Sequence, residues 1–381
     1  MTNPAEARYD DVERAESVRI ADLEHVLESC RDELVELAGS RILVTGGAGF
    51  LGYYLVQVPL HWNRSHTAAE RIRVTVHDNF TRGLPPWLEQ LGDGDGALDV
   101  VRHDTRDALP PEVGDIDWVF HAAGIASPMV YRQHPIATMD ANIVGHRNLL
   151  DHAAEREQGE RPLRSLVFFS SSEIYGDPHE DWIPTPETYR GYVSSTGPRS
   201  CYDESKRYGE TLCVAFVREH GVRASMVRPF NNYGPGLRLT DGRVIPDFAR
   251  DILAGRDMVM YSDGGATRTF CYVADAVCGY YKALVRGQPG EPYNVGSDGP
   301  EVSVQELAQR MQRIGAELTG YGGVVRRETS ADAEYLVDNP TRRCPDLTKS
   351  RSDLKYDPSI DLDEGLRRSL LWYASDPAAG T

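Results

Sequence analysis

Residues 42–52 read ILVTGGAGFLG, an apolar run that passes through a glycine-rich turn into the start of a helix. Gly46 and Gly49 allow the backbone to approach a pyrophosphate, whose charge would lie at the positive end of that helix. Gly52 lets helix and strand pack closely. A glycine pattern alone also fits a simple tight turn, but here an apolar strand precedes it and an acidic residue, Asp78, ends the next strand. This context favours a dinucleotide-binding loop.

Apolar strands alternate with helical segments after this loop. We expect helices notably at 135–155 and 202–219, and strands at residues 42–45, 72–77, 99–102, 118–121, 166–170 and 224–228. Such alternation predicts an α/β fold of the Rossmann type, a doubly wound parallel sheet. Ligands bind to such sheets in the crevice at the carboxyl ends of the strands.

The chain on either side of this sheet has a different pattern. After residue 230 the strands become short and Gly/Pro-rich turns increase, which predicts a smaller C-terminal lobe with helices at 244–254, 273–285, 302–317 and 362–374. Before the loop, apolar residues at helical spacing predict an amphipathic helix that packs on the body or on a second subunit: Ile20, Leu23, Leu27, Cys30, Leu34 and Leu37. We therefore expect an N-terminal helical extension (1–38), a Rossmann domain that binds NAD (39–230) and a mainly substrate-binding lobe (231–381).

The composition excludes several classes of function. The chain has 381 residues, 40% hydrophobic and 26% charged, as in soluble globular proteins. A formal net charge of −17 disfavours nucleic acid as a partner. No apolar run is long enough to span a bilayer, and the acidic N-terminus lacks the apolar core of a secretory signal. We expect a cytoplasmic protein whose six cysteines are reduced and mostly buried; none forms a CxxC pair, and no metal site is expected.

The expected cofactor contacts follow the ends of the first four strands. The Asp78 carboxylate is placed to accept hydrogen bonds from the adenosine ribose, and it would repel a 2′-phosphate, which favours NAD over NADP. Arg82 nearby could accept that phosphate, so NADP remains an alternative. Asp104 is expected near the adenine. The remaining contacts are expected from Phe50, Leu51, Asn79, Phe80, Thr81, Thr105, Ala122 and Ala123.

Tyr202 and Lys206 stand four residues apart, on one face of a predicted helix. A free tyrosine has a pKa of about 10, too high for a base at neutral pH. Lys206, with a positive nicotinamide ring, would stabilise the phenolate and let Tyr202 take a hydroxyl proton. Ser171, Ser172 and Glu173 follow the fifth strand, at the same edge of the sheet, and we expect them to join the catalytic site; the alternative for a serine run is a polar turn.

These motifs together resemble the extended short-chain dehydrogenase/reductase family of nucleotide-sugar epimerases, dehydratases and decarboxylases, over about residues 40–375. Within it the pattern is most similar to the UDP-glucuronate decarboxylases (UDP-xylose synthases). Four segments carry this resemblance: SSEIYGDP (171–178), GPRSCYDESKR (197–207), DGRVIPDF (241–248) and TRTF (267–270).

The resemblance implies a reaction and also shows where the chain departs from the pattern. Decarboxylases typically carry Thr-Ser-Glu at 171–173, whereas sugar 4,6-dehydratases carry Thr-Asp-Glu, so Ser172 favours decarboxylation. Two departures weaken the match: the segment 231–235 is nearer the dehydratase form, and Asp140 stands where decarboxylases tend to have a lysine. A 4,6-dehydratase and a 4-epimerase remain the alternatives.

The implied reaction oxidises C4 of UDP-glucuronate with NAD, gives a 4-ketone β to the carboxylate and releases carbon dioxide. The product is UDP-4-keto-xylose or, if the hydride returns, UDP-xylose. Arg268, Arg343 and Arg243 are expected at the diphosphate; Tyr131, Asn148 and Asn231 are expected at the sugar or nucleotide. The resemblance also implies a homodimer through helices 135–155 and 202–219, with contacts from Leu149, Leu150, Leu212 and Phe216.

Overall fold

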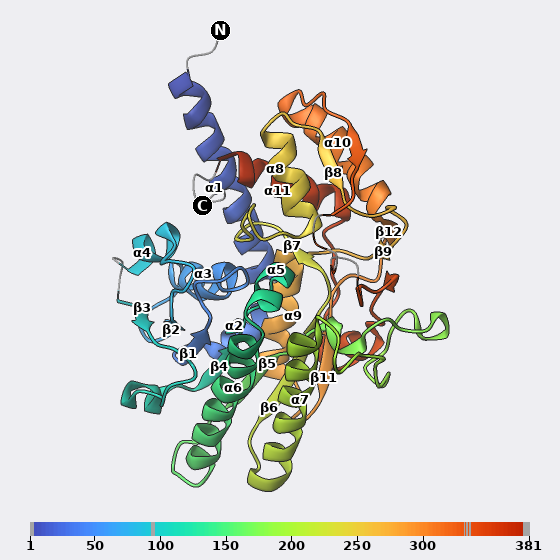
Figure 1. Cartoon of the computed structure of the whole chain (residues 1–381). Helices are drawn as coiled ribbons and strands as arrows, with labels where there is room; N and C mark the ends of the chain where they lie inside the picture. The colour runs from blue at the N-terminus through green and yellow to red at the C-terminus, as the bar shows by residue number, and fades with distance from the viewer. Residues whose placement is uncertain (1–3, 93–95, 331, 333, 335–336, 376–381) are drawn as a thin grey trace.

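A seven-stranded parallel sheet forms the centre of the computed structural model, which describes residues 4–92, 96–330, 332, 334 and 337–375. The strand order is β11-β6-β5-β4-β1-β2-β3, so the order reverses between β1 and β4 (Figure 1). The strands are β1 (Arg41–Thr45), β2 (Arg73–Asp78), β3 (Leu98–Arg102), β4 (Trp118–His121), β5 (Ser165–Phe169), β6 (Ala224–Pro229) and β11 (Pro292–Val295). The predicted Rossmann-type fold is confirmed, and β11 is a strand that the sequence pattern did not indicate.

Helices cover both faces of this sheet. Successive side chains of β1 point to opposite faces: Ile42 and Val44 lie in one apolar core, and Leu43 lies in the other. The first core is shared with α2 (Arg31–Leu37), α3 (Gly52–Asn63) and α9 (Val273–Arg286), and the second with α6 (Pro135–Glu157) and α7 (Ser200–His220). Two short helices, α4 (Pro86–Gly92) and α5 (Pro128–Gln133), follow β2 and β4.

The four residues expected at a dimer interface lie inside the subunit. Leu149, Leu150, Leu212 and Phe216 belong to the core between α6, α7 and the sheet, and none is more than 9% exposed. The expectation that they contact a second subunit is therefore wrong, because these apolar faces pack on the sheet. Large apolar side chains on the outer surface of the two helices are instead Ile136, Val144 and Tyr208.

A smaller lobe lies over the end of the sheet at which the carboxyl ends of the strands meet (Figure 1). Its helices are α8 (Val244–Leu253), α10 (Val304–Thr319) and α11 (Leu362–Ser375). Among its short strands, β8 (Met258–Met260) pairs with β13 (Val325–Arg327). The strand β9 (Thr267–Arg268) lies between β12 (Val302–Ser303) and β14 (Arg342–Arg343) and pairs with both. A further pair, β7 (Asn232–Tyr233) and β10 (Cys271–Tyr272), precedes α9. Since α9 and β11 return to the central sheet, residues after 230 contribute to both parts.

The N-terminal extension forms two helices, α1 (Pro4–Ser29) and α2, and it packs on the body of the protein. Asp22 of α1 is fully buried and accepts hydrogen bonds from the hydroxyls of Tyr54 and Tyr272 and from Arg368. These partners belong to α3, β10 and α11, so α1 connects the sheet to the lobe. Ile20, which was expected on the buried face, is 37% exposed. Within the described ranges, no helix combines the length and apolar character needed to span a membrane.

Candidate active site

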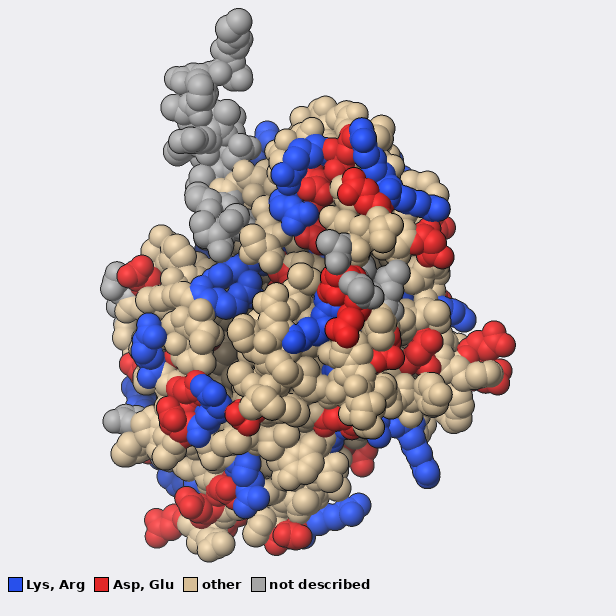
Figure 2. Space-filling model, in the orientation of Figure 1, with Lys and Arg blue, Asp and Glu red and all other residues tan. Residues whose placement is uncertain are grey.

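A cavity of about 940 Å³ lies at the carboxyl ends of the strands, between the sheet and the lobe. Figure 2 shows a hollow in this face of the molecule, with basic side chains beside it. The volume suits small-molecule ligands. The predicted site residues all line this cavity except Phe80 and Asn148. The motifs that are scattered along the sequence therefore meet at one place.

The glycine turn forms a cradle at one end of the cavity. Gly46 has a φ of +72°, and a Cβ added there would lie 2.7 Å from the Cα of Ala123. A Cβ at Gly49 would lie 3.1 Å from the Gly46 carbonyl oxygen. The helix α3 that follows has no side-chain cap at its N-terminus, which leaves main-chain N–H groups available for an anion. The turn therefore fits the pyrophosphate of a dinucleotide.

The Asp78 carboxylate ties the turn to the end of β2. One of its oxygens accepts the Ala48 N–H at 3.0 Å, and the other accepts the Phe80 N–H at 2.8 Å. Burial raises the pKa of Asp78. Each oxygen keeps a lone pair for a ribose hydroxyl. Phe80 itself, with a φ of +54°, has its ring 5.2 Å from the Arg102 guanidinium and does not line the cavity.

Asp104 lies beside Asp78 at the same edge. Asn79 donates to Asp104 at 3.0 Å, and Arg106 donates to both carboxylate oxygens at 2.9 and 2.8 Å. The Arg106 guanidinium holds the pKa of Asp104 well below its usual range. Asp104 is therefore a fixed anion at the end of the cavity where the adenosine is expected.

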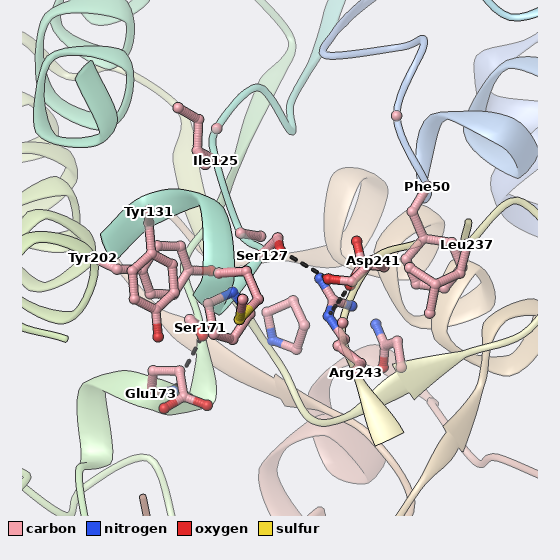
Figure 3. A pocket seen from close by; sticks show the side chains of 18 of the residues that line it. Phe50, Ile125, Ser127, Tyr131, Ser171, Glu173, Tyr202, Leu237, Asp241 and Arg243 are labelled. Atoms are coloured by element: carbon pink, nitrogen blue, oxygen red, sulfur yellow. Dashed lines mark hydrogen bonds and ion pairs between the residues drawn. The ribbon is translucent and has the colours of Figure 1, made fainter. Parts of the chain in front are cut away.

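Tyr202 and Lys206 lie on α7 and point into the middle of the cavity. Lys206 Nζ donates to the Phe169 carbonyl at 2.8 Å, and burial lowers the pKa of Lys206 to about 7. Burial raises the pKa of Tyr202 to about 12, opposed by a hydrogen bond with Ser171. Tyr131 stacks on Tyr202, with ring centroids 5.1 Å apart (Figure 3). The phenol therefore needs further positive charge, such as a nicotinamide ring, to act as a base near neutral pH.

Glu173 follows the same strand end and is held by two arginines. Its N–H donates to Ser171 Oγ at 3.1 Å, while Arg343 pairs with Oε1 and Arg199 pairs with Oε2. Burial alone would raise the pKa of Glu173, but the two guanidinium groups outweigh it and lower that pKa to about 2. Arg343 also lies 3.5 Å from Ser172 Oγ. Arg343 was expected at the diphosphate, but these contacts place it beside the catalytic loop.

The other expected substrate contacts are distributed along the cavity. Arg268 donates to the carbonyls of Thr267 at 2.8 Å and Pro340 at 2.5 Å, and Arg243 pairs with Asp241 at 2.9 Å. Asn231 donates to the Thr269 carbonyl at 2.9 Å. The Tyr131 hydroxyl is buried without a hydrogen-bond partner among the described residues.

Asn148 is not brought to the cavity. Its amide donates to the carbonyls of Thr105 at 2.9 Å and Asp107 at 3.0 Å. Because α6 runs beside the turn after β3, the side chain holds that turn in place. The expectation that Asn148 contacts a substrate is therefore corrected to a structural role.

The comparisons with known proteins agree with this geometry. Residues 42–296 match the model of the NAD dependent epimerase/dehydratase family. The chain belongs to this family. It is 36% identical to UDP-glucuronic acid decarboxylase 5 of Arabidopsis thaliana over 86% of this chain and 87% of that protein. It is 35% identical to UDP-glucuronic acid decarboxylase 1 of Xenopus tropicalis over 90% of this chain and 74% of that protein.

Solved structures of the family share the fold. The dTDP-glucose 4,6-dehydratase DesIV from Streptomyces venezuelae, with NAD and TYD bound, superposes with a TM-score of 0.74 at 27% identity, over 87% of this chain and 96% of that one. The predicted membership of the NAD-dependent epimerase/dehydratase family is thus confirmed, and so is the predicted similarity to UDP-glucuronate decarboxylases. The cradle at Gly46 and the uncapped start of α3 fit the NAD that the family description names.

Several residues that line the cavity were not predicted, and Arg199 is the one that pairs with Glu173. Arg199 lies three residues before Tyr202, within the segment that carried the family resemblance, and its side chain is only 11% exposed. A basic residue one turn before the tyrosine was the available signal. Its partner Glu173 is 26 residues away in the chain, so the sequence pattern did not indicate the pair.

Proposed function

We propose that this enzyme decarboxylates UDP-glucuronate after oxidising C4 of the sugar with NAD. The observation that carries the proposal is a surplus of positive charge around Glu173. Arg199, Arg343 and Arg268 are all close enough to interact electrostatically with this one carboxylate. Asp203 nearby has its pKa raised to about 8 by burial and by Glu173, so it adds little negative charge at neutral pH.

This balance suits an acidic sugar. A uronic acid brings a carboxylate that would compensate the extra guanidinium charge in the cavity, whereas a neutral hexose would leave that charge uncompensated. The serine at 172 supports the same choice, since the dehydratase pattern has a carboxylic acid there. Arg243 remains the proposed contact to the diphosphate, whereas Arg268 is reassigned from the diphosphate to the positive charge beside Glu173. Tyr131 and Asn231 remain the proposed contacts to the sugar or nucleotide.

The residues of the chain have separate roles in the proposed reaction. The glycine turn and Asp78 would hold NAD, which when bound would supply the acceptor for the C4 hydride. Tyr202 takes the proton of the 4-hydroxyl, and Lys206 and Ser171 stabilise the phenolate. The resulting 4-ketone lies β to the carboxylate, so the bond from C5 to the carboxyl carbon breaks, carbon dioxide leaves and the electron pair moves to the ketone oxygen.

Later steps decide which product leaves the enzyme. A proton added at C5 gives UDP-4-keto-xylose, and return of the hydride to C4, with the proton of Tyr202 returned to the 4-oxygen, gives UDP-xylose. Glu173 and Ser172 lie beside Arg343 at the sugar end of the cavity, where they would control the proton at C5. We also propose a homodimer in which the outer surfaces of α6 and α7 meet their copies, with Ile136, Val144 and Tyr208 in the contact.

The test is the mass of the product made from UDP-glucuronate and NAD. We expect loss of carbon dioxide; loss of water would instead show a dehydratase, and an isomer of unchanged mass would show an epimerase. Tyr202→Phe keeps the ring but removes the proton acceptor, so NAD binding should persist while turnover falls about 10²–10⁴-fold. Decarboxylation at near wild-type rate by this variant would contradict the oxidation-first mechanism.

A further inference from the structure

Arg199 connects three members of the site from the start of α7. Its carbonyl accepts the N–H groups of Tyr202 at 3.0 Å and Asp203 at 3.1 Å, so its backbone is part of the first turn of the helix. Its guanidinium pairs with Glu173 and lies 6.0 Å from the centroid of the Tyr131 ring, which stacks on Tyr202. One side chain thus pairs with the acid and lies near the Tyr131 ring.

We propose that Arg199 is a positioning residue that keeps Glu173 ionised and directed into the cavity, in fixed relation to Tyr202. The inference rests on the proposed function, because it assumes that an acidic sugar enters beside Glu173. It assigns different tasks to the two arginines that pair with this carboxylate.

The two arginines differ in where they are anchored. Arg343 belongs to β14 of the lobe, next to Arg268 in β9, and it also donates to the Gly176 carbonyl at 3.0 Å. The Nε atoms of both arginines are buried without a hydrogen-bond partner in the described part of the chain, so the difference between them lies in their anchorage and not in this capacity. Arg199 is the N-cap residue of α7, directly before the helix that carries Tyr202 and Lys206. The relation of Arg199 to the base is therefore fixed by the first turn of this helix.

The second arginine matters once an anionic substrate is present. A substrate carboxylate near β14 would share Arg343 with Glu173 and weaken their pairing. A buried carboxylate that loses compensating charge has a raised pKa and becomes protonated. Arg199 prevents this, because its pair with Glu173 does not depend on the lobe.

Other charged and titratable groups also face Glu173. They are Tyr202 and Asp203 on α7, Tyr131 on α5, Arg268 on β9 and Arg343 on β14. The two other arginines, Arg268 and Arg343, belong to the lobe, whereas Arg199 directly precedes the helix of the proposed base. Removal of Arg199 should therefore affect Glu173 more than it affects substrate binding through the lobe.

The experiment compares Arg199→Gln and Arg199→Lys with the wild type. For Arg199→Gln we expect the pKa of Glu173 to rise from about 2 by about one to three units, which brings an acid limb into the kcat profile above about pH 3, with a smaller change in KM. Arg199→Lys, which keeps the charge, should restore part of the shift. Arg218→Gln, at the exposed end of α7, is the matched control and should match the wild type.

A double-mutant cycle with Glu173→Gln separates positioning from a general structural effect. If Arg199 acts through Glu173, its replacement should cost little more once Glu173 is already glutamine. Additive losses, an unmoved acid limb, or a raised KM with unchanged kcat would each overturn the inference.

The ionisation of Glu173 can be followed without turnover. Carbon NMR on protein labelled at glutamate carboxyls identifies its resonance by the loss of that signal in Glu173→Gln. The pKa of Glu173 should rise in Arg199→Gln. If that variant does not fold, Arg199→Lys should show a smaller rise. An unchanged pKa in the folded variants would overturn the inference. A wild type that titrates Glu173 as expected but releases no carbon dioxide would refute the proposed function alone.

Discussion

Replacing Gly46 by alanine tests whether the glycine turn is a cofactor cradle. Two costs arise at this position. Alanine must adopt the φ of +72°, which costs about 1–2 kcal/mol, and its Cβ would lie 2.7 Å from the Cα of Ala123 and 2.8 Å from the Ala123 nitrogen. Both close atoms are backbone, so the turn after β1 and the loop after β4 must separate by several tenths of an ångström.

Gly221 provides a matched control for this change. It ends α7 with a φ of +73°, and a Cβ added there would meet nothing within 4 Å. Gly221→Ala should therefore cost only the backbone strain. Gly46→Ala should add about 1–3 kcal/mol of overpacking to the same strain, so its total loss should be about 2–5 kcal/mol. Urea unfolding of the two variants measures the difference.

The functional consequence should be larger for Gly46→Ala. Gly46 and Ala123 both line the cavity, so their separation displaces the wall against which the dinucleotide would lie. We expect NAD affinity to fall at least about tenfold, or about 1.4 kcal/mol, in calorimetric titration. Gly221→Ala should bind NAD as the wild type does. Wild-type NAD affinity in Gly46→Ala, or equal losses of stability in the two variants, would refute the reasoning.

Three further predictions test the cofactor choice, the N-terminal extension and the assembly. Asp78→Ala should weaken NAD more than NADP in parallel titrations, and an unchanged ratio of the two affinities would show that Asp78 does not select the cofactor. Asp22→Ala leaves two tyrosine hydroxyls and Arg368 without their buried acceptor, so it should lower the free energy of unfolding in urea by about 3–5 kcal/mol. A loss below about 1 kcal/mol would contradict a role of Asp22 in joining α1 to the body. In sedimentation the wild type should be a dimer and a variant with both Ile136→Glu and Val144→Glu should be a monomer, whereas a wild-type monomer at micromolar concentration would exclude this contact.

The sheet could be predicted because each of its first six strands is a local apolar run followed by a turn signal. β11 could not, since it has four residues, begins with proline and is defined by its pairing with β6. The positions of the main helices were likewise predicted, but the sequence did not show which face of a helix packs on the sheet and which lies on the outer surface. Leu149 and Phe216 fit either a core or a subunit interface by their spacing, and the sheet takes this face.

The site followed the same division between local and distant information. Gly46, Asp78 and Tyr202 could be identified because each belongs to a motif of a few residues. The position of Arg343 could not, because its partner Glu173 is 170 residues away in the chain. Likewise Asn148 is polar and lies near a strand end, yet α6 directs its amide to a turn. When long-range packing determines where a side chain lies, the sequence reveals its residue type but not its role.

The distribution of these residues explains how one fold accommodates related reactions. The glycine turn, Asp78 and Tyr202 come from the sheet and α7, and they suit any oxidation of a sugar alcohol by NAD. Solved structures with this fold include a dehydratase and an epimerase, so the fold does not select the reaction. In this chain the lobe contributes Arg343, which pairs directly with Glu173, and Arg268 on the neighbouring strand, and we propose that these two arginines select the substrate. Since buried guanidiniums act at short range, the proposed attraction of an acidic sugar is compatible with a net charge of −17, whose field is screened over about 8 Å at physiological salt.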